Sequence, residues 1–185
     1  MNTIKFITPA QVRSMCPQIN QEIEDGLIND SITLMQEAVI KPTFGYDFYN
    51  ELILQKSGGT YSTANKTLMD SYISWILSFA VWQNLVVSTS YQLNSSGLRL
   101  KTSDHSVLAE SVDIQYCRSY TQNFIDSTRR SMFDYMEDNK TSYPTYFNNR
   151  VGGRNMTYDW KIGSVGGIGT RTRSIPTYYN SHENN

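Results

Sequence analysis

The sequence has few of the residues on which most catalytic and metal-binding sites depend. Among 185 residues it has two histidines, His105 and His182, and two cysteines, Cys16 and Cys117. A metal site needs three or four ligands at suitable spacing, and these four residues are too scattered to supply them. The cysteines are far apart in sequence, so we expect reduced thiols in the core and not a disulfide pair. The sequence therefore predicts no metal, no cofactor and no disulfide.

A long hydrophobic run is also missing. The most apolar stretch, residues 72–87, contains four polar residues. It is shorter than the ~20 residues that a membrane-spanning helix needs. The N-terminal residues MNTIKFITPAQ contain no apolar core of the kind that secretory signals have. We therefore expect a soluble intracellular protein with no membrane partner, in which residues 72–87 form a buried helix.

No catalytic motif stands out. Ser103, Asp104 and His105 have the side chains of a hydrolase triad. Neighbours in a chain cannot normally form that hydrogen-bonded relay, and Asp104 is better interpreted as a helix cap. Other acidic pairs have the spacing of solvated helix faces: Glu22 with Glu24, and Asp134 with Asp138. The sequence thus predicts a protein that is not an enzyme and has no catalytic residues.

The pattern that is present is helical. Hydrophobic spacing and capping signals predict helices over residues 9–15, 25–40, 46–55, 65–88 and 106–139. Thr8 should cap the first helix, and Ser62 or Thr63 the fourth. We expect the second helix to end before Pro42, because the residue before a proline is pushed out of helical geometry. Pro42 and Gly45 then form a structural link to the third helix.

Apolar residues recur at helical spacing in these segments, and we expect each set to lie on one side of its helix. The sets are Leu27, Ile28, Leu34, Met35, Ala38 and Val39; Phe48, Tyr49, Leu52 and Ile53; and Val112, Tyr116, Tyr120, Phe124, Met132 and Tyr135. The central helix carries Tyr72, Trp75, Phe79 and Trp82, for which core packing is a commoner role than stacking on nucleic-acid bases. We expect Arg129 and Arg130 on the surface.

Residues 91–104 have the pattern of a β-hairpin with its turn at residues 94–97. After residue 148 the helical periodicity stops, and Gly, Asn, Ser, Thr and Arg predominate. The fold class that we predict is therefore mainly α: a helical bundle with a small β-hairpin and an extended C-terminal arm. Residues 1–149 form the helical domain and residues 150–185 form the arm.

The arm differs from the helical domain in charge. It has five Lys or Arg and two Asp or Glu, a net charge of +3, whereas residues 1–149 have eleven and fifteen, a net charge of −4. Its glycines do not have the spacing of a nucleotide-binding loop, since Gly169 is followed by Thr170 and Arg171 where a Walker loop requires Lys. We expect instead a segment that becomes ordered against a partner. The expected contact residues are Arg150, Arg154, Tyr158, Trp160, Lys161, Arg171, Arg173, Tyr178 and Tyr179.

The run at residues 25–53, DGLINDSITLMQEAVIKPTFGYDFYNELI, resembles the small helical head–tail connector proteins of tailed bacteriophages. The similarity is nearest to those of phages that infect Bacteroidetes, including the crAss-like group. That family has an Ile-x-Pro-x-Leu-Gly link followed by a Leu/Phe-Tyr-x-x-Leu helix, which here correspond to IKPTFG and FYNEL. Phe44 stands where the family has leucine. The later elements follow the same order, so the resemblance covers residues 8–148.

The resemblance implies a virion structural protein of the phage neck, present in the host cytoplasm during assembly. About twelve copies would form a homo-oligomeric ring that contacts the portal protein and further tail or ring proteins, and DNA would pass through the lumen without specific binding. The alternative is a nucleic-acid-binding module that uses the basic, aromatic arm. An acidic groove on a protein suits the same residues, and we prefer the protein partner.

Overall fold

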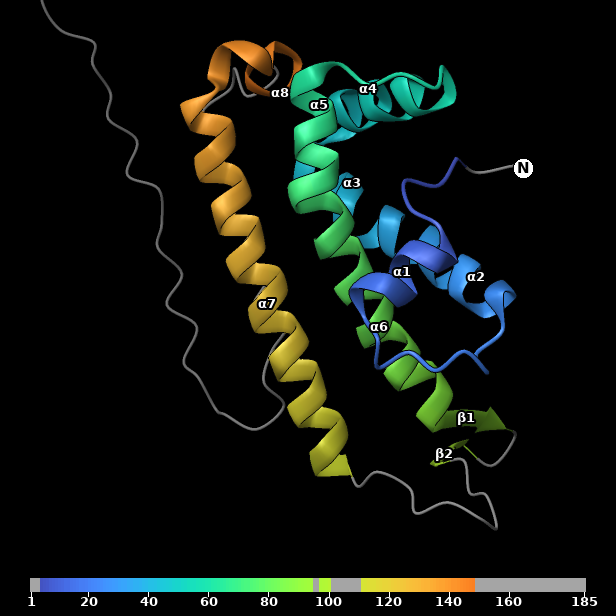
Figure 1. Ribbon diagram of the computed structural model, residues 1–185. Coiled ribbons are helices and arrows are strands. Elements are labelled where there is room, and N and C mark those ends of the chain that lie inside the picture. Colours follow the sequence, from blue (N-terminus) through green and yellow to red (C-terminus); the bar gives the residue numbers. More distant parts are fainter. Residues whose placement is uncertain (1–3, 95–96, 101–110, 149–185) are drawn as a thin grey trace, which may run out of the picture. The chain divides into compact units, whose positions relative to one another are not determined.

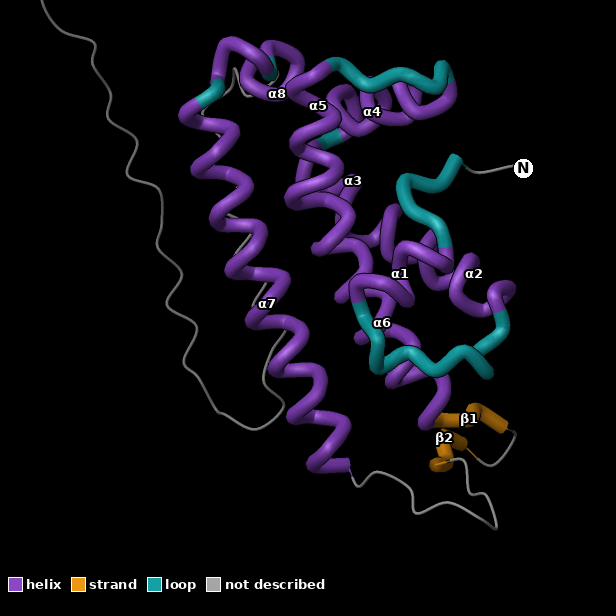
Figure 2. The backbone as a smooth tube through the Cα atoms, viewed as in Figure 1, coloured by secondary structure: helices purple, strands orange, loops and turns teal. Residues whose placement is uncertain are grey.

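The computed structural model describes residues 4–94, 97–100 and 111–148, and this part of the chain is mainly helical, as predicted (Figure 1, Figure 2). Eight α-helices are described: α1 (Pro9–Met15), α2 (Asp25–Met35), α3 (Lys41–Phe44), α4 (Tyr46–Ser57), α5 (Thr63–Leu68), α6 (Ser74–Ser90), α7 (Ser111–Asp138) and α8 (Pro144–Asn148). Two π-helices, η1 (Gln36–Ile40) and η2 (Met69–Ile73), and a 3-10 helix, η3 (Lys140–Ser142), join some of them.

The predicted helix starts are confirmed by their caps. The Thr8 hydroxyl accepts a hydrogen bond from the Gln11 backbone N–H, and the Gln11 side chain accepts one from the Thr8 N–H at 2.9 Å. This reciprocal pair satisfies two backbone donors that the first turn of α1 leaves unpaired. Ser62 caps α5 in a similar way, because its hydroxyl accepts from the Asn65 N–H at 3.2 Å.

The second predicted helix does not end before Pro42, so this prediction is wrong. α2 continues through η1 into α3, and Lys41 keeps helical angles although a proline follows it. In η1 the Lys41 N–H pairs with the Gln36 carbonyl, five residues back, which is the π-helical spacing. Pro42 then lies in the first turn of α3, where a missing N–H costs little. The real break is at Gly45, three residues later.

The apolar side of α2 also differs from the prediction. Ile28, Ile32 and Ile40 are buried, whereas Leu27 and Leu34 are 40% and 54% exposed. Both sets have helical spacing, and the isoleucine set is the one that faces α6, where the Ser31 hydroxyl donates to Asn84 at 3.0 Å. The predicted face of the next helix is confirmed, since Phe48, Tyr49 and Leu52 of α4 are buried. Ile53 is partly buried there.

α5, η2 and α6 follow one another without a break from Thr63 to Ser90 and form the central helix of the fold. α7 packs along one side of α6, and α1 and α2 pack against the other side (Figure 1). Because it has neighbours on both sides, α6 buries residues around most of its surface, including Ile76, Leu77 and Val81. The prediction of a buried helix over residues 72–87 is confirmed.

At one end of the bundle, aromatic residues join α4, α7 and α8. Phe48 contacts Tyr143 and Tyr146, with ring centroids 6.0 Å and 5.8 Å away. Tyr143 is almost fully buried, and its hydroxyl donates to the Ala64 carbonyl at 3.0 Å. This cluster ties the end of α7 to the start of the central helix.

At the far end of α6, two short strands follow directly. β1 (Tyr91–Asn94) pairs in antiparallel fashion with β2 (Gly97–Leu100), and Tyr91 lies opposite Leu100 in the register. The predicted segment 91–104 extends beyond β2 into residues that lie outside the described part of the chain.

Candidate interaction surface

The nine residues that the sequence predicts as partner contacts all belong to the C-terminal arm. They lie at positions 150–179, outside the residues that the structure describes, and so do both histidines. The two residues of the predicted link are described. Pro42 lies in the first turn of α3, and Gly45 joins α3 to α4 with φ +76° and ψ 170°. That backbone conformation is essentially restricted to glycine, so the turn between α3 and α4 requires glycine at this position.

The side chain of Gln36 organises the surroundings of this link. Gln36 is fully buried in η1; its carbonyl oxygen accepts from the Phe6 N–H, and its amide donates to the Ile4 carbonyl, both at 2.9 Å. The same amide donates to the Tyr49 hydroxyl at 3.0 Å. These bonds fix the N-terminal segment and α4 against the π-helix. Their pattern is that of a structural network, because every polar group involved is paired within the protein.

Glu37 continues this network to the surface. It accepts from the Tyr49 hydroxyl at 2.9 Å and from Lys41 at 2.6 Å. The Lys41 hydrogen bond is the main reason why the pKa of the Glu37 carboxyl lies below its usual range. Burial raises the pKa of Tyr49 to about 12. A strongly ionised carboxylate and a tyrosine that stays protonated do not provide a general base poised near neutral pH.

The other reactive side chains within the described ranges are no better suited to catalysis. Burial raises the pKa of Cys16 to about 12 and raises that of Cys117 as well, so both thiols are poor nucleophiles. Both are free, as predicted. The acidic pairs at residues 22/24 and 134/138 are exposed, as predicted. No group of three or more His, Cys, Asp or Glu is arranged to hold a metal ion in the part of the chain that the structure describes.

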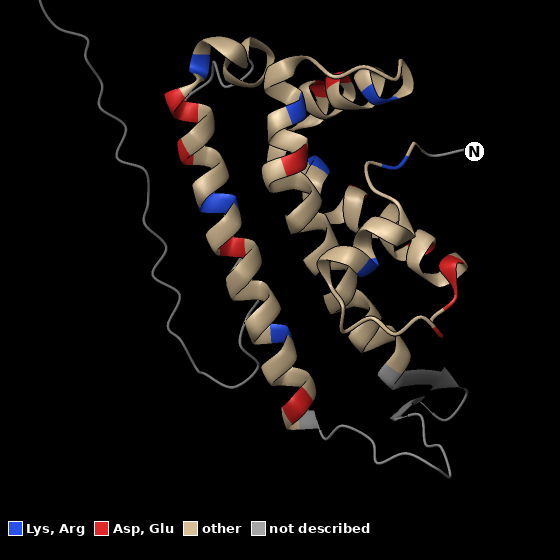
Figure 3. Cartoon of the chain, in the orientation of Figure 1, with Lys and Arg blue, Asp and Glu red and all other residues tan. Residues whose placement is uncertain are grey.

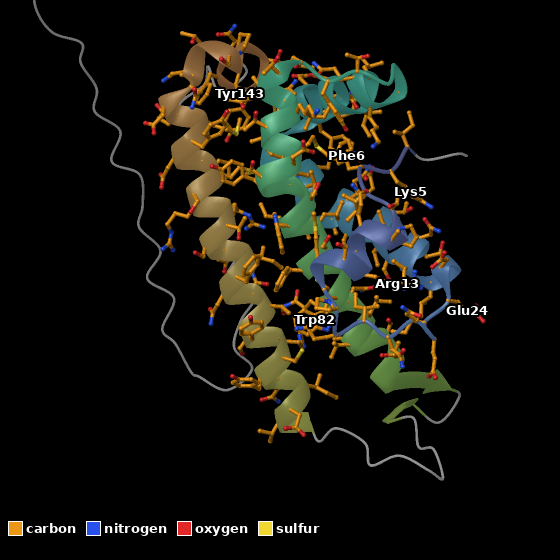
Figure 4. The ribbon with its side chains drawn as sticks, in the orientation of Figure 1. Lys5, Phe6, Arg13, Glu24, Trp82 and Tyr143 are labelled. Atoms are coloured by element: carbon orange, nitrogen blue, oxygen red, sulfur yellow. The ribbon has the colours of Figure 1, made fainter. Side chains whose placement is uncertain are left out.

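The aromatic residues of α6 are engaged with rings of α7. Phe79 stacks on Phe124 with centroids 3.8 Å apart, and Trp82 meets Tyr120 at 6.2 Å, while Tyr72 of η2 stacks on Tyr135 at 5.4 Å. Trp82 lies between the two helices in Figure 4. Together these rings form a continuous aromatic seam between α6 and α7. Core packing is thus confirmed for Phe79, while Tyr72 and Trp82 are partly buried. Trp75 contacts the ring of Phe124 at 6.1 Å but is 36% exposed, so the prediction of core packing is wrong for this residue.

The N-terminal half of α7 carries an exposed apolar face. Val112, Tyr116 and Tyr120 succeed one another at four-residue steps and are 67%, 74% and 51% exposed. The sequence predicted that these three residues share one side of the helix with Met132, but Met132 is fully buried, so that grouping is wrong. We call Val112, Tyr116 and Tyr120 the α7 face. Such a row of large side chains on one helix marks a site of protein contact more often than scattered single residues do.

A second exposed apolar surface lies on α2. Leu27 and Leu34 are two helical turns apart on the side that α6 does not cover, and we call this pair the α2 face. It lies beside exposed carboxylates, including Asp30. α4 exposes further apolar side chains at Tyr46 and Leu54, 69% and 70% exposed. The described helices therefore present apolar side chains to solvent on more than one side of the bundle.

Arg129 departs from its predicted place on the surface. Its side chain is 22% exposed, its Nε is buried without a hydrogen-bond partner, and its guanidinium lies 3.7 Å from Asp126. Burial lowers the pKa of Arg129, and the Asp126 carboxylate partly offsets that effect. Arg130, the next residue, is exposed as predicted.

A sequence signal could have distinguished the two sides of α7. The residues that face the core there are Ile114, Thr121, Ile125, Met132 and Met136, which recur at alternating steps of seven and four. That alternation is as regular as the spacing of the apolar set that was predicted from the sequence, Val112 to Tyr135, but it includes the polar Thr121. Because Thr121 donates its hydroxyl to the Cys117 carbonyl at 2.9 Å, a polar residue is tolerated at this buried position.

Comparisons with known proteins place the chain in a family. No helix among the described residues has the length and hydropathy required to cross a bilayer. Neither a curated protein nor a solved structure matches the chain. A family model described as a family of unknown function, DUF6712, matches residues 40–156, more than half of the chain, and the protein therefore belongs to this family.

Proposed function

We propose that this protein is a non-enzymatic structural subunit of a phage neck, which assembles into a ring between the portal and the tail. The observation that carries the proposal is the α7 face. A subunit of an assembly must leave apolar side chains uncovered until its neighbours arrive, and Tyr116 and Tyr120 offer large contact areas with a polar hydroxyl at the tip.

The sequence resemblance supplies the particular assembly. The IKPTFG and FYNEL segments resemble those of head–tail connectors, and here they fall on the junction of η1, α3 and α4. The described side chains offer neither a metal cluster nor a reactive thiol, which is compatible with a structural role. In this proposal the helical domain contributes the subunit contacts, and the basic arm contacts the portal or a neighbouring subunit.

Electron microscopy of the purified protein mixed with the portal protein from the same genome tests this function. We expect rings of about twelve copies bound to one end of the portal. A chain lacking residues 150–185 should fold normally and bind the portal more weakly. A persistent monomer that leaves the portal bare contradicts the proposal, and an unfolded truncation contradicts the separation of arm and helical domain.

The second candidate is a nucleic-acid-binding module, and the charge of residues 150–185 is the feature that favours it. This reading predicts affinity for DNA or RNA that falls steeply as salt increases, because each phosphate contact releases a counterion. A gel-shift titration at two salt concentrations separates the candidates: the ring subunit shows no stable salt-sensitive complex, whereas the binding module shows one.

A further inference from the structure

We infer that residues 171–179, in the C-terminal arm of one copy, bind the α2 face of a neighbouring copy. This inference rests on the proposed function, because it names the surface that receives the arm in the ring. Its starting point is a row of exposed residues on α2 that is both apolar and acidic. Leu27 and Leu34 are 40% and 54% exposed, and Asp30, which lies between them in sequence, is exposed as well.

The helical positions place Asp30 on the same side of α2 as the two leucines. With 3.6 residues per turn, Asp30 lies about 60° around the helix from Leu27 and about 40° from Leu34. The buried Ile28 and Ile32 lie on the opposite side, each about 160° from Asp30. The solvent side of α2 therefore combines two leucine side chains with a carboxylate.

The charge around the α2 face is negative. Residues 20–36 contain four carboxylates and no Lys or Arg. Asp25 pairs with Arg13, and among the described residues no ion pair involves Glu22, Glu24 or Asp30. Figure 3 shows the acidic group at the outer end of α2.

The nearby lysines do not neutralise Asp30. Lys41, the first basic residue after α2 in sequence, pairs with Glu37 at 2.6 Å. Lys5 donates to the Asn29 side chain at 2.9 Å, and Asn29 lies about 100° around the helix from Asp30. The α2 face thus suits a partner that is both basic and apolar.

Residues 171–179 of the arm, RTRSIPTYY, have this composition. They include two arginines, no carboxylate, an isoleucine and two tyrosines. Arginine forms strong hydrogen bonds with carboxylates, and tyrosine and arginine are enriched in protein interfaces. The earlier part of the arm suits the α2 face less well, because Asp159 lies next to Trp160.

The α7 face does not offer the same complementarity. Asp113 and Arg118 are both exposed in that part of α7, so charges of both signs accompany its apolar residues. Of the two faces, the α2 face is therefore the one that matches the basic segment in charge.

The arm is long enough to reach beyond its own copy. α8 ends at Asn148, and Arg171 follows 23 positions later. Those residues span at most about 76 Å when extended, whereas α7, with 28 residues, is about 42 Å long. A contact between two different surfaces of the same protein leaves one of each surface free on every added copy, so it propagates until a ring closes.

Photo-crosslinking of the full chain tests this contact. p-Benzoylphenylalanine replaces Leu34, and in the matched control it replaces Ser131, an exposed residue of α7. Isotopically heavy and light forms of each protein are mixed, assembled with and without the portal, and irradiated. We expect position 34 to capture residues 171–179, with heavy–light pairs as frequent as pairs of one label, and position 131 to capture none of them.

Charge reversal measures the electrostatic part of the contact. Asp30→Lys changes the α2 face, and Arg171→Glu together with Arg173→Glu changes the arm. Each change should weaken association about tenfold, because like charges then meet across the contact. The variant that carries all three substitutions should recover most of the wild-type association, since the charges are again opposite.

Asp134→Lys is the control for the reversal on the α2 face. It makes the same charge change at an exposed position of α7 and should leave association unchanged. Thermal melts verify the fold of every variant, and mass photometry and sedimentation give the masses.

Other results overturn the contact. If position 34 captures the arm only within chains of one label, the arm binds its own copy. Capture of residues 112–120 at position 34 would show that the α7 face is the occupant. The absence of any capture, in free oligomers and on the portal, excludes the contact, and so does a combined variant that associates no better than the single reversals.

The contact and the neck function can fail separately. Rings that form on the portal with either reversal variant as readily as with the wild type show that other surfaces join the subunits, and they leave the ring function standing. Capture of the arm from a neighbouring copy without portal binding supports the contact and counts against the neck function.

Discussion

The two halves of α7 have similar hydrophobic spacing and opposite surroundings. In the C-terminal half, Met132 and Met136 are fully buried, and Tyr135 stacks on Tyr72. In the N-terminal half, Tyr116 and Val112 stand in solvent, and only Ile114 among the large apolar residues is buried. The difference comes from what lies opposite. η2 packs against α7, and the rings of Tyr143 and Tyr146 contact its C-terminal half, whereas the N-terminal half packs on α6. Apolar spacing thus predicts a helix, and its neighbours decide what the apolar side does.

The largest expected effect on stability is in the buried, C-terminal half of α7. Met132→Ala removes a fully buried side chain of α7 from the hydrophobic core. We expect the free energy of unfolding to fall by about 2–5 kcal/mol, since the cavity adds to the lost burial. Urea unfolding followed by circular dichroism measures it. A loss below ~1 kcal/mol would mean that this half of α7 is not packed as described.

Gly45→Ala tests the turn that directs α4 toward the aromatic residues that follow α7. Gly45 aims α4, whose Phe48 packs on Tyr143 and Tyr146. Nothing lies within 4 Å of the position that an added Cβ would take, so backbone strain at φ +76° is the whole effect. We expect a loss of about 1–3 kcal/mol. Pro42→Ala is the comparison variant and should change the free energy of unfolding much less. Equal losses in the two variants would assign the break to the wrong residue.

Tyr143→Phe makes a smaller change in the same region. It removes the hydroxyl that donates to the Ala64 carbonyl and keeps the ring in place. We expect a loss of about 0.5–1.5 kcal/mol, the usual net contribution of one hydrogen bond. Thermal unfolding monitored by calorimetry resolves this difference. A stability equal to the wild type would indicate that water replaces Tyr143 at that carbonyl.

Tyr116→Ala gives the smallest effect on the isolated subunit. Because Tyr116 is mostly exposed, its removal should change the free energy of unfolding of the monomer by no more than about 0.5 kcal/mol. This small change in the free energy of unfolding is compared with the large one expected for Met132→Ala. Both are measured by urea unfolding at micromolar protein concentration. If both variants lost several kcal/mol of unfolding free energy, the two halves of α7 would not differ in burial as described.

Much of the helical arrangement could be predicted from the sequence because its signals are local. Thr8 and Ser62 cap helices through hydrogen bonds to residues three positions away, and Gly45 breaks the chain through its own backbone angles. Such features depend on a few neighbouring residues. The sequence therefore located the starts of α1 and α4 correctly and that of α5 to within two residues.

Other features depend on contacts between distant residues. The helix passes Pro42 because η1 precedes it, and Gln36 within η1 is held by Phe6 and Ile4 from the N-terminal segment. The hydrophobic spacing does not show whether Leu27 or Ile28 is buried. The packing of α2 on α6 decides this, and Ile28 is the buried residue. The candidate site could be predicted from the sequence less well than the fold. Its predicted contacts lie in residues 150–185, outside the described part, and the hydrophobic spacing did not separate the exposed α7 face from buried residues such as Met132.

Radical footprinting of the wild-type protein tests the α7 face most directly. Tyr116 and Tyr46 are exposed to similar extents in the isolated subunit, 74% and 69%, so their side chains should be oxidised at similar rates when the protein is dilute. As concentration increases and rings form, we expect Tyr116 and Tyr120 to become protected while Tyr46 keeps its rate. Assembled rings in which Tyr116 remains as reactive as Tyr46 would contradict the claim that the α7 face joins the subunits.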